Sequence, residues 1–365
     1  MLSLHVGTYT RNGGAGLHRL VRSADRGWGI APAYPGARNA SFGAFSVRRG
    51  LAYLVDESRD GRIGIFRQTE AGWHRIVRVT TLGREPCYLA LDADETALAV
   101  ANYGSGSIAL YRLDAAGLPL GEAATYAHAG HGPVEDRQEA PHAHCACFSR
   151  DQDWLYQVDL GTDEVVAHRL AAGILSEHRI AFRAPGGTGP RHLVLHPVLP
   201  FALLLGELDS SLTVLDVTGD KMKERQRVST LPPDFTGDSL GGHLSVNAVG
   251  DRVYVTNRGH DSVATFAWGT QGALTLLQHA PSGGASPRAL ALLEAERQLL
   301  LANEESGSVS VFDMLDDGTL RLAGAPIAVP GAAFLLVAGN EPASTGTTET
   351  DAVPAAPGAN SLRGG

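Results

Sequence analysis

The hydrophobic and polar positions of this chain repeat in one pattern along most of its length. Each repeat has an apolar strand, a short polar turn, a second apolar strand, another turn and a third strand in which apolar and polar residues alternate. Short apolar runs and alternation with a period of two are typical of β-strands. Six segments follow the pattern, beginning at Ser41, Pro86, Pro141, Gly189, His243 and Ser286.

The spacing of the repeats indicates the type of all-β fold. Their third strands align at Phe66, Tyr111, His168, Leu215, Phe266 and Phe312, in steps of 45, 57, 47, 51 and 46 residues. A four-stranded unit of roughly 40–50 residues is the signature of a β-propeller blade. We expect the variable fourth strand on the outside, as at residues 73–82 and 175–183. Residues 123–140 and 230–242 delay the following repeats and are candidate walls or lids.

A seventh blade can be assembled from the two ends of the chain. Residues 2–10 and 16–22 have the pattern of inner strands without a partner at the axis, and residues 333–338 can supply the innermost strand. The sequence therefore predicts an all-β fold, a seven-bladed β-propeller over residues 1–338, closed by pairing of its N- and C-terminal strands. Residues 339–365 are poor in large apolar side chains and are predicted to form a disordered tail.

Composition and charge indicate which kinds of partner and which cellular compartment to expect. The 365 residues carry a net charge of −9 without long charged runs, and the sequence shows no basic stripe that would suggest a nucleic-acid partner. No apolar run approaches the roughly 20 residues that span a bilayer, so we expect no membrane partner. With no recognisable signal peptide and three cysteines, we expect a cytoplasmic protein without a disulfide framework, as a monomer or a weak homo-oligomer.

The predicted topology gathers polar residues at one mouth of the central channel. The start of each first strand and the end of each second strand lie at the same end of a blade, because the two strands are antiparallel. The side chains placed there include His142, His144, Arg191, His192 and Arg288 from first strands, and Asn102, Glu207 and Arg258 from second strands. Such a convergence of Arg, His and Glu is a candidate site.

Turn chemistry offers a second explanation for some of these residues. Asn often ends a strand because its side chain satisfies the turn backbone, which Asn102 can equally do. Arg191 and Arg258 favour a site, since an Arg near the axis requires an anionic partner. We assign substrate binding to four of the residues: His142, His192, Arg288 and Asn102.

The segment HAHCAC at residues 142–147 raises the alternative of a metal site, because His and Cys at short spacing suit zinc. Strand alternation places His142 and His144 on one side and Cys145 and Cys147 on the other. Two cysteines at this spacing are more often small core side chains. We therefore predict no metal ion and no organic cofactor.

The same residues carry a family resemblance. The run GPRHLVLHPVLPFALLLGELDSSLTVLDV at residues 189–217, the DLGTD turn before it and the YVTNRG segment after it resemble successive units of the seven-bladed propeller lactonases. That family includes the propeller-type 6-phosphogluconolactonase and the carboxy-cis,cis-muconate lactonising enzyme. The resemblance covers about residues 3–338 and implies four catalytic residues, His144, Arg191, Glu207 and Arg258.

One position departs from the family. The fifth unit usually begins with a small residue followed by an acid, whereas this chain has Gly242, His243 and Leu244. The hydrogen-bond support on that side of the site therefore need not follow the family.

Lactone opening requires an activated water, an anchor for the negative charge on the carbonyl oxygen and a proton for the leaving alkoxide. A Glu beside Arg stays ionised, so Glu207 can take the proton from water, and His144 can donate to the leaving oxygen or share the role of base. Arg191 can hold the oxyanion, a phosphate or a carboxylate. The leading hypothesis is hydrolysis of a small anionic sugar lactone, 6-phospho-D-glucono-1,5-lactone.

Two alternatives from other classes stay open on the sequence alone. A muconate-type cyclase would use the same Arg side chains to hold carboxylates while it closes a ring. A propeller without catalytic activity would use the same mouth as a binding platform.

Overall fold

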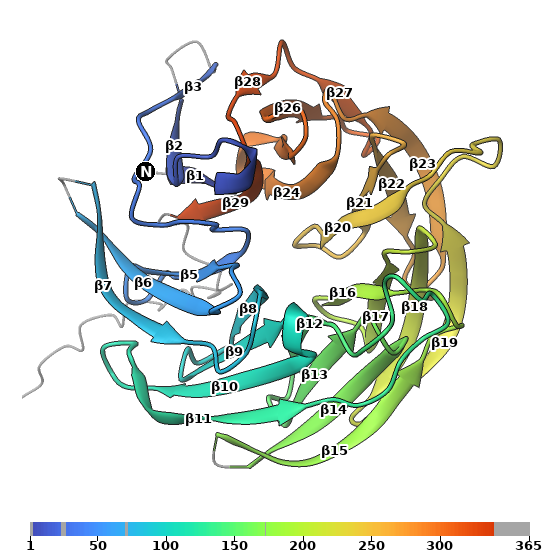
Figure 1. The fold of residues 1–365 in the computed structure, drawn as a ribbon. Helices are drawn as coiled ribbons and strands as arrows, with labels where there is room; N and C mark the ends of the chain where they lie inside the picture. Colours follow the sequence, from blue (N-terminus) through green and yellow to red (C-terminus); the bar gives the residue numbers. More distant parts are fainter. Residues whose placement is uncertain (1–2, 23–26, 70–71, 172, 339–365) are drawn as a thin grey trace, which may run out of the picture.

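Seven antiparallel sheets form a ring around a central axis, as predicted (Figure 1). The computed structural model describes residues 3–22, 27–69, 72–171 and 173–338, and the predicted disordered tail lies outside the described residues. The described part contains no α-helix, and hence no helix that could cross a membrane. Three short 3₁₀ turns join strands, at Thr10–Asn12, Tyr103–Ser105 and Glu294–Glu296.

The first three blades follow the chain from the axis outward. Blade 1 contains β4 (Gly43–Ser46), β5 (Leu51–Asp56), β6 (Arg62–Thr69) and β7 (Gly72–Thr80). Blade 2 contains β8 (Pro86–Leu91), β9 (Ala97–Asn102), β10 (Ser107–Leu113) and β11 (Pro119–Ala127). Blade 3 contains β12 (Ala143–Phe148), β13 (Trp154–Asp159), β14 (Glu164–Ala171) and β15 (Ile174–Arg183).

The next three blades repeat this order. Blade 4 contains β16 (Pro190–Leu195), β17 (Phe201–Gly206), β18 (Ser211–Thr218) and β19 (Lys221–Ser229). Blade 5 contains β20 (Leu240–Val246), β21 (Arg252–Arg258), β22 (Ser262–Trp268) and β23 (Leu274–Pro281). Blade 6 contains β24 (Pro287–Leu293), β25 (Gln298–Asn303), β26 (Ser308–Met314) and β27 (Leu320–Leu322), and the short β28 (Ile327–Ala328) also pairs with β26.

The seventh blade combines both ends of the described chain, which confirms the predicted closure. Its order from the axis is β29 (Ala332–Ala338), β1 (Ser3–Thr8), β2 (Leu17–Arg22) and β3 (Trp28–Ile30). Strand β29 runs antiparallel to β1 and lies between it and the axis (Figure 1). Strand β1, which no earlier strand of the chain could pair with, thus has β29 as its inner partner.

Face-to-face packing of neighbouring blades explains why the second strands are apolar along their length. Strands β9, β17 and β25 are buried at every position. A strand that is covered on both faces has no solvent side on which polar residues could alternate. Between blades 4 and 5, for example, Leu203 and Leu205 belong to one cluster with Val253 and Val255.

Two predicted loops are shorter than the sequence suggested. Residues 123–127 belong to β11, so the connection to β12 comprises residues 128–142. Residues 240–242 belong to β20, so the loop before it comprises residues 230–239. Ala makes up three of residues 123–127 and Gly two of residues 240–242, and both residue types are depleted in strands.

Six of the seven inner strands carry a β-bulge near their start. The ladder with the second strand slips there by one residue, so that the inner strand has one residue in excess. A bulge re-aims a side chain and is common beside active sites. The residues at the bulges are Cys87, His144, Arg191, Gly242 with His243, Arg288 and Ala333.

The seam between blades 7 and 1 depends on a glycine. A Cβ at Gly7 in β1 would clash with the carbonyl oxygen of Ala40, in the segment that leads into blade 1. We expect Gly7→Ala to lower Tm by roughly 1.5–4 °C, corresponding to about 1–3 kcal/mol, because the backbone at the seam has to move.

The matched control is Gly29→Ala in β3, where the nearest atom to an added Cβ is 3.9 Å away. Thermal unfolding followed by circular dichroism would compare the two variants. Equal Tm values for Gly7→Ala and Gly29→Ala would contradict the close contact at the seam.

Candidate active site

A buried carboxylate, Glu207, lies at the centre of a charged cluster at the axial mouth. Glu207 directly follows β17 in blade 4, and its side chain is 3% exposed. Its Oε2 atom lies 2.5 Å from Nη1 of Arg191, 3.1 Å from Nη2 of Arg258 and 3.8 Å from Nε2 of His144. The structure thus brings the four predicted catalytic residues together from blades 3, 4 and 5.

A third arginine, Arg137, joins this cluster from the loop between β11 and β12. Its Nη2 atom donates to Oε1 of Glu207 at 2.6 Å, on the side of the carboxylate that Arg191 and Arg258 leave open. Arg137 is not among the residues predicted for the site, because its loop has no periodicity in the sequence that would place it. The one available signal was the length of the connection before the third repeat.

Main-chain carbonyls hold the two buried guanidinium groups in place. Nε of Arg191 donates to the carbonyl of Gly242, and Nη2 of Arg258 donates to that of Gly241 at 2.8 Å. A Cβ on Gly241 would lie 2.6 Å from the carbonyl oxygen of Gly206, so this close approach of two backbones requires glycine. The hydrogen-bond support on this side of the site therefore comes from the main chain.

The charges of the cluster follow from burial and from neighbouring groups. Burial alone would raise the pKa of Glu207, but Arg258 and Arg191 outweigh it and hold this pKa well below its usual value. Burial, assisted by Arg191, holds the pKa of His144 well below its usual value, so its ring is neutral. Burial lowers the pKa of Arg258 to about 10, which leaves it charged at neutral pH. With Arg137, three guanidinium groups face one carboxylate.

Aromatic and imidazole rings fill the channel beside the charged cluster. Phe42 stacks on Tyr88 at 4.0 Å between ring centroids and lies 5.0 Å from Phe334. His192 lies 5.4 Å from Tyr88 and 5.0 Å from His243. His192, predicted to contact substrate, is therefore part of this buried layer of rings. Burial also keeps its pKa well below the usual value.

Comparison with known proteins identifies the family. A family model described as a seven-bladed β-propeller lactonase matches residues 3–337. The chain belongs to this family. The chain is therefore a lactonase, and the names of its relatives agree on sugar lactones as the general substrate class.

Two solved structures and one curated sequence illustrate how far the similarity extends. A 6-phosphogluconolactonase of Bacillus subtilis is 30% identical over 335 residues, which cover 89% of this chain and 95% of the relative. A protein of Lactobacillus plantarum has a TM-score of 0.86 at 28% identity, covering 92% of this chain and 99% of that one. The periplasmic gluconolactonase of Pseudomonas aeruginosa has a TM-score of 0.84 at 27% identity, covering 93% and 99%.

In this lactonase Arg288 belongs to a second cluster, at the seam of blades 6, 7 and 1. Nη1 of Arg288 lies 3.3 Å from Glu304 and its Nη2 lies 4.0 Å from Glu57. The hydroxyl of Tyr9 donates to Glu57 at 2.6 Å, and Arg11 lies 3.0 Å from Glu304. Arg288 thus reaches the mouth as predicted, but two carboxylates of the protein already accompany it.

Two of the predicted substrate contacts lie away from Glu207. The ring of His142 stacks on Tyr103 at 4.4 Å between centroids, with Nε2 3.1 Å from a carboxylate oxygen of Glu139. Asn102 is fully buried, and its Nδ2 donates to the carbonyl of Thr81 at 3.2 Å. On the sequence, Asn102 suited either a turn or substrate binding. Its contact with the Thr81 carbonyl corresponds to the role in a turn.

The bulge at His144 changes the predicted alternation of the HAHCAC segment. It places His144 beside Arg191, and the ring of Tyr103 contacts both histidines, stacking on His142 and meeting His144 edge-on at 5.5 Å between centroids. Cys145 is buried in the core, as predicted. Within the described ranges, no group of three His, Cys, Asp or Glu side chains is arranged to hold a metal ion.

A cleft of about 790 Å³ opens beside the charged cluster of the lactonase. Arg258 lines it at one end, and Arg11, Arg288 and Glu304 line the part near the second cluster. Ser239 and Ser286 add hydroxyl groups to its wall. The cleft has room for a sugar-sized molecule and reaches Arg258, which contacts Glu207.

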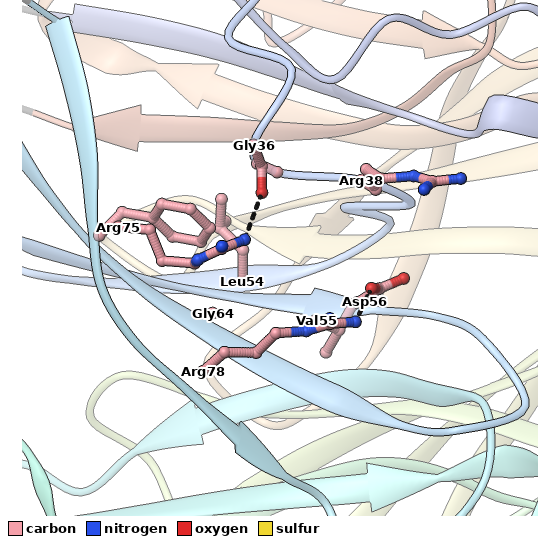
Figure 2. A pocket seen from close by; sticks show the side chains of 10 residues that line it. Gly36, Arg38, Leu54, Val55, Asp56, Gly64, Arg75 and Arg78 are labelled. Atoms are coloured by element: carbon pink, nitrogen blue, oxygen red, sulfur yellow. Dashed lines mark hydrogen bonds and ion pairs between the residues drawn. The ribbon is translucent and has the colours of Figure 1, made fainter.

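A smaller hollow of about 90 Å³ lies on the flank of blade 1 (Figure 2). Arg75 and Arg78 of β7 reach across it, donating to the carbonyl of Gly36 at 3.4 Å and to Asp56 at 2.6 Å. Since its volume is small and both arginines have partners within the protein, this hollow does not compete with the cleft.

Buried neutral histidines predict a loss of stability in acid. Burial, assisted by Arg191, lowers the pKa of His243 to about 3, against an ordinary value of 6.5. Between these values the unfolded chain binds a proton that the folded chain does not, so stability falls as the pH falls. We expect His243→Asn to flatten the pH dependence of unfolding free energy between pH 6 and pH 4 by up to about 1.4 kcal/mol per pH unit.

Urea unfolding at several pH values would measure this difference. The control is His74→Asn, which changes an exposed histidine on β7. A slope for His243→Asn that matches both the unmodified protein and the control would show that His243 is protonated in the folded state.

Proposed function

We propose that this lactonase hydrolyses 6-phospho-D-glucono-1,5-lactone to 6-phosphogluconate, in the cytoplasm and within the oxidative pentose phosphate pathway. The observation that carries the proposal is the surplus of positive charge around Glu207. Three guanidinium groups with one carboxylate suit a substrate that brings its own negative charge. The name of the Bacillus subtilis relative supports the same substrate.

The cluster offers an anchor for the charge that develops during hydrolysis. Attack of water on the lactone carbonyl converts its oxygen into an oxyanion, and the ring oxygen then leaves with a proton. Arg191 and Arg258 are fixed by main-chain carbonyls, so their guanidinium groups are already oriented before the reaction. Donors that are oriented in advance stabilise a developing oxyanion without a reorganisation cost.

His144 is better suited than Glu207 to be the general base. Both carboxylate oxygens of Glu207 already accept from guanidinium groups, whereas Nε2 of His144 has a single donor, Arg191. An arginine only donates hydrogen bonds, so Nε2 of His144 accepts from Arg191 and carries a lone pair. Neutral His144 can accept the proton of the attacking water when this lone pair turns from Arg191 to the water, while Glu207 orients the arginines as their counter-ion. On the sequence, Glu207 was expected to take the proton, with His144 donating to the leaving oxygen or sharing the role of base; in this proposal His144 alone is the base.

A direct assay tests the substrate. Purified protein should accelerate the loss of freshly generated 6-phosphogluconolactone above its spontaneous rate, with and without EDTA. Unphosphorylated gluconolactone and a carboxymuconate would be assayed beside it. Activity on the carboxymuconate alone, or on none of the three, would refute the proposal.

Replacement of His144 tests the base. We expect His144→Ala to lower kcat by roughly 10²–10⁴-fold, because proton abstraction from water is lost. Added imidazole should restore part of kcat in His144→Ala but not in Glu207→Gln, since only the first variant leaves a cavity for the missing base. Near-normal kcat in folded His144→Ala would exclude His144 as the base.

A further inference from the structure

We infer that Arg137 is a specificity-determining residue that binds the phosphate of the substrate at the mouth. This inference rests on the proposed function and names the group that selects the phosphorylated lactone. It starts from the contacts of Arg137, which lies outside the strands and outside the family motifs quoted above.

The loop that carries Arg137 is folded onto blade 3. Gln138 is fully buried, and its Nε2 donates to the carbonyl of Leu160 at 2.8 Å. The backbone N–H of Gln138 donates to the carbonyl of Val134 at 2.7 Å, and that of Gly132 donates to Gln138 at 2.9 Å. The residue next to Arg137 is therefore an anchor, so the position of Arg137 is set before a ligand arrives.

Arg137 is the most accessible of the three arginines around Glu207. Its side chain is 33% exposed, compared with 5% for Arg191 and 12% for Arg258. Arg137 also partly offsets the rise that burial causes in the pKa of Tyr103, which shows that the guanidinium lies close to this phenol. A guanidinium has five N–H donors, and contacts with Glu207 and Tyr103 leave donors for an incoming phosphate.

The opposite end of the cleft is unsuited to a phosphate. There Arg11 and Arg288 are matched by Glu57 and Glu304. Further carboxylates line the same cleft, those of Asp238, Asp261 and Glu305. Asp238 and Asp261 lie beside Gly259, next to Arg258, so carboxylates extend along the cleft. They repel a dianionic group, whereas the three arginines around Glu207 attract it. The hydroxyl groups of the sugar can meet the mixed polar wall of the cleft.

The test compares ligands that differ only in phosphate. Calorimetry would measure the Kd of 6-phosphogluconate and of gluconate, and kinetics would measure KM for the two lactones. We expect Arg137→Gln to weaken binding of 6-phosphogluconate about tenfold or more and to raise KM for the phosphorylated lactone similarly. Gluconate and the unphosphorylated lactone should change by less than about threefold, since Arg191 and Arg258 still hold Glu207.

Two further variants complete the design. Arg179→Gln is the matched control, because Arg179 on the outer strand of blade 3 forms an exposed ion pair with Glu177. Arg11→Gln probes the opposite end of the cleft. Selective loss of phosphate recognition in Arg11→Gln, or equal loss for both ligands in Arg137→Gln, would overturn the inference. If the protein binds 6-phosphogluconate through Arg137 but hydrolyses no lactone, the proposed function fails and the inference stands.

Discussion

The pairing of β29 with β1 converts a row of blades into a ring. Without it, blade 6 and blade 1 would each expose a flat apolar face, and the inner strands would not surround an axis. Closure requires segments from the two ends of the propeller to meet, which has a large entropic cost in the unfolded chain. Ion pairs of Arg288 with Glu57 and of Arg11 with Glu304 link blades 6, 7 and 1 at the mouth. The charged mouth therefore exists only in the closed ring.

Burial of charge at that mouth serves the chemistry more than the stability of the fold. Taking Glu207 and two nearly inaccessible guanidinium groups out of water carries a desolvation cost that their attraction only partly offsets. The arrangement leaves positive charge uncompensated and holds His144 neutral. Both properties suit a site that awaits an anionic substrate and must then abstract a proton.

The fold and the centre of the site could be predicted because they follow from repetition. Blade boundaries, the outer strands and the closing strand all follow from patterns that recur along the chain, and the topology places Arg191, Glu207 and Arg258 together. The bulges could not be predicted, because a one-residue slip depends on how an inner strand meets its neighbours at the axis. Arg137 was missed since its position is set by buried Gln138 and the turn at Leu160, not by periodicity. Asn102 could not be assigned from the sequence, because the same residue type suits both a turn and a ligand.

The bulges have a consequence for how such a protein can change over generations. In each blade except the first, the bulge of the inner strand leaves at least one residue at the channel mouth outside the hydrogen-bonded ladder of its sheet. Here these positions hold a small residue in blade 7, a thiol in blade 2, an imidazole in blade 3 and guanidinium groups in blades 4 and 6. An exchange at one of them alters the chemistry of the mouth while the packed faces between blades stay intact. The ring can thus acquire new substrates one position at a time, without passing through sequences that fail to fold.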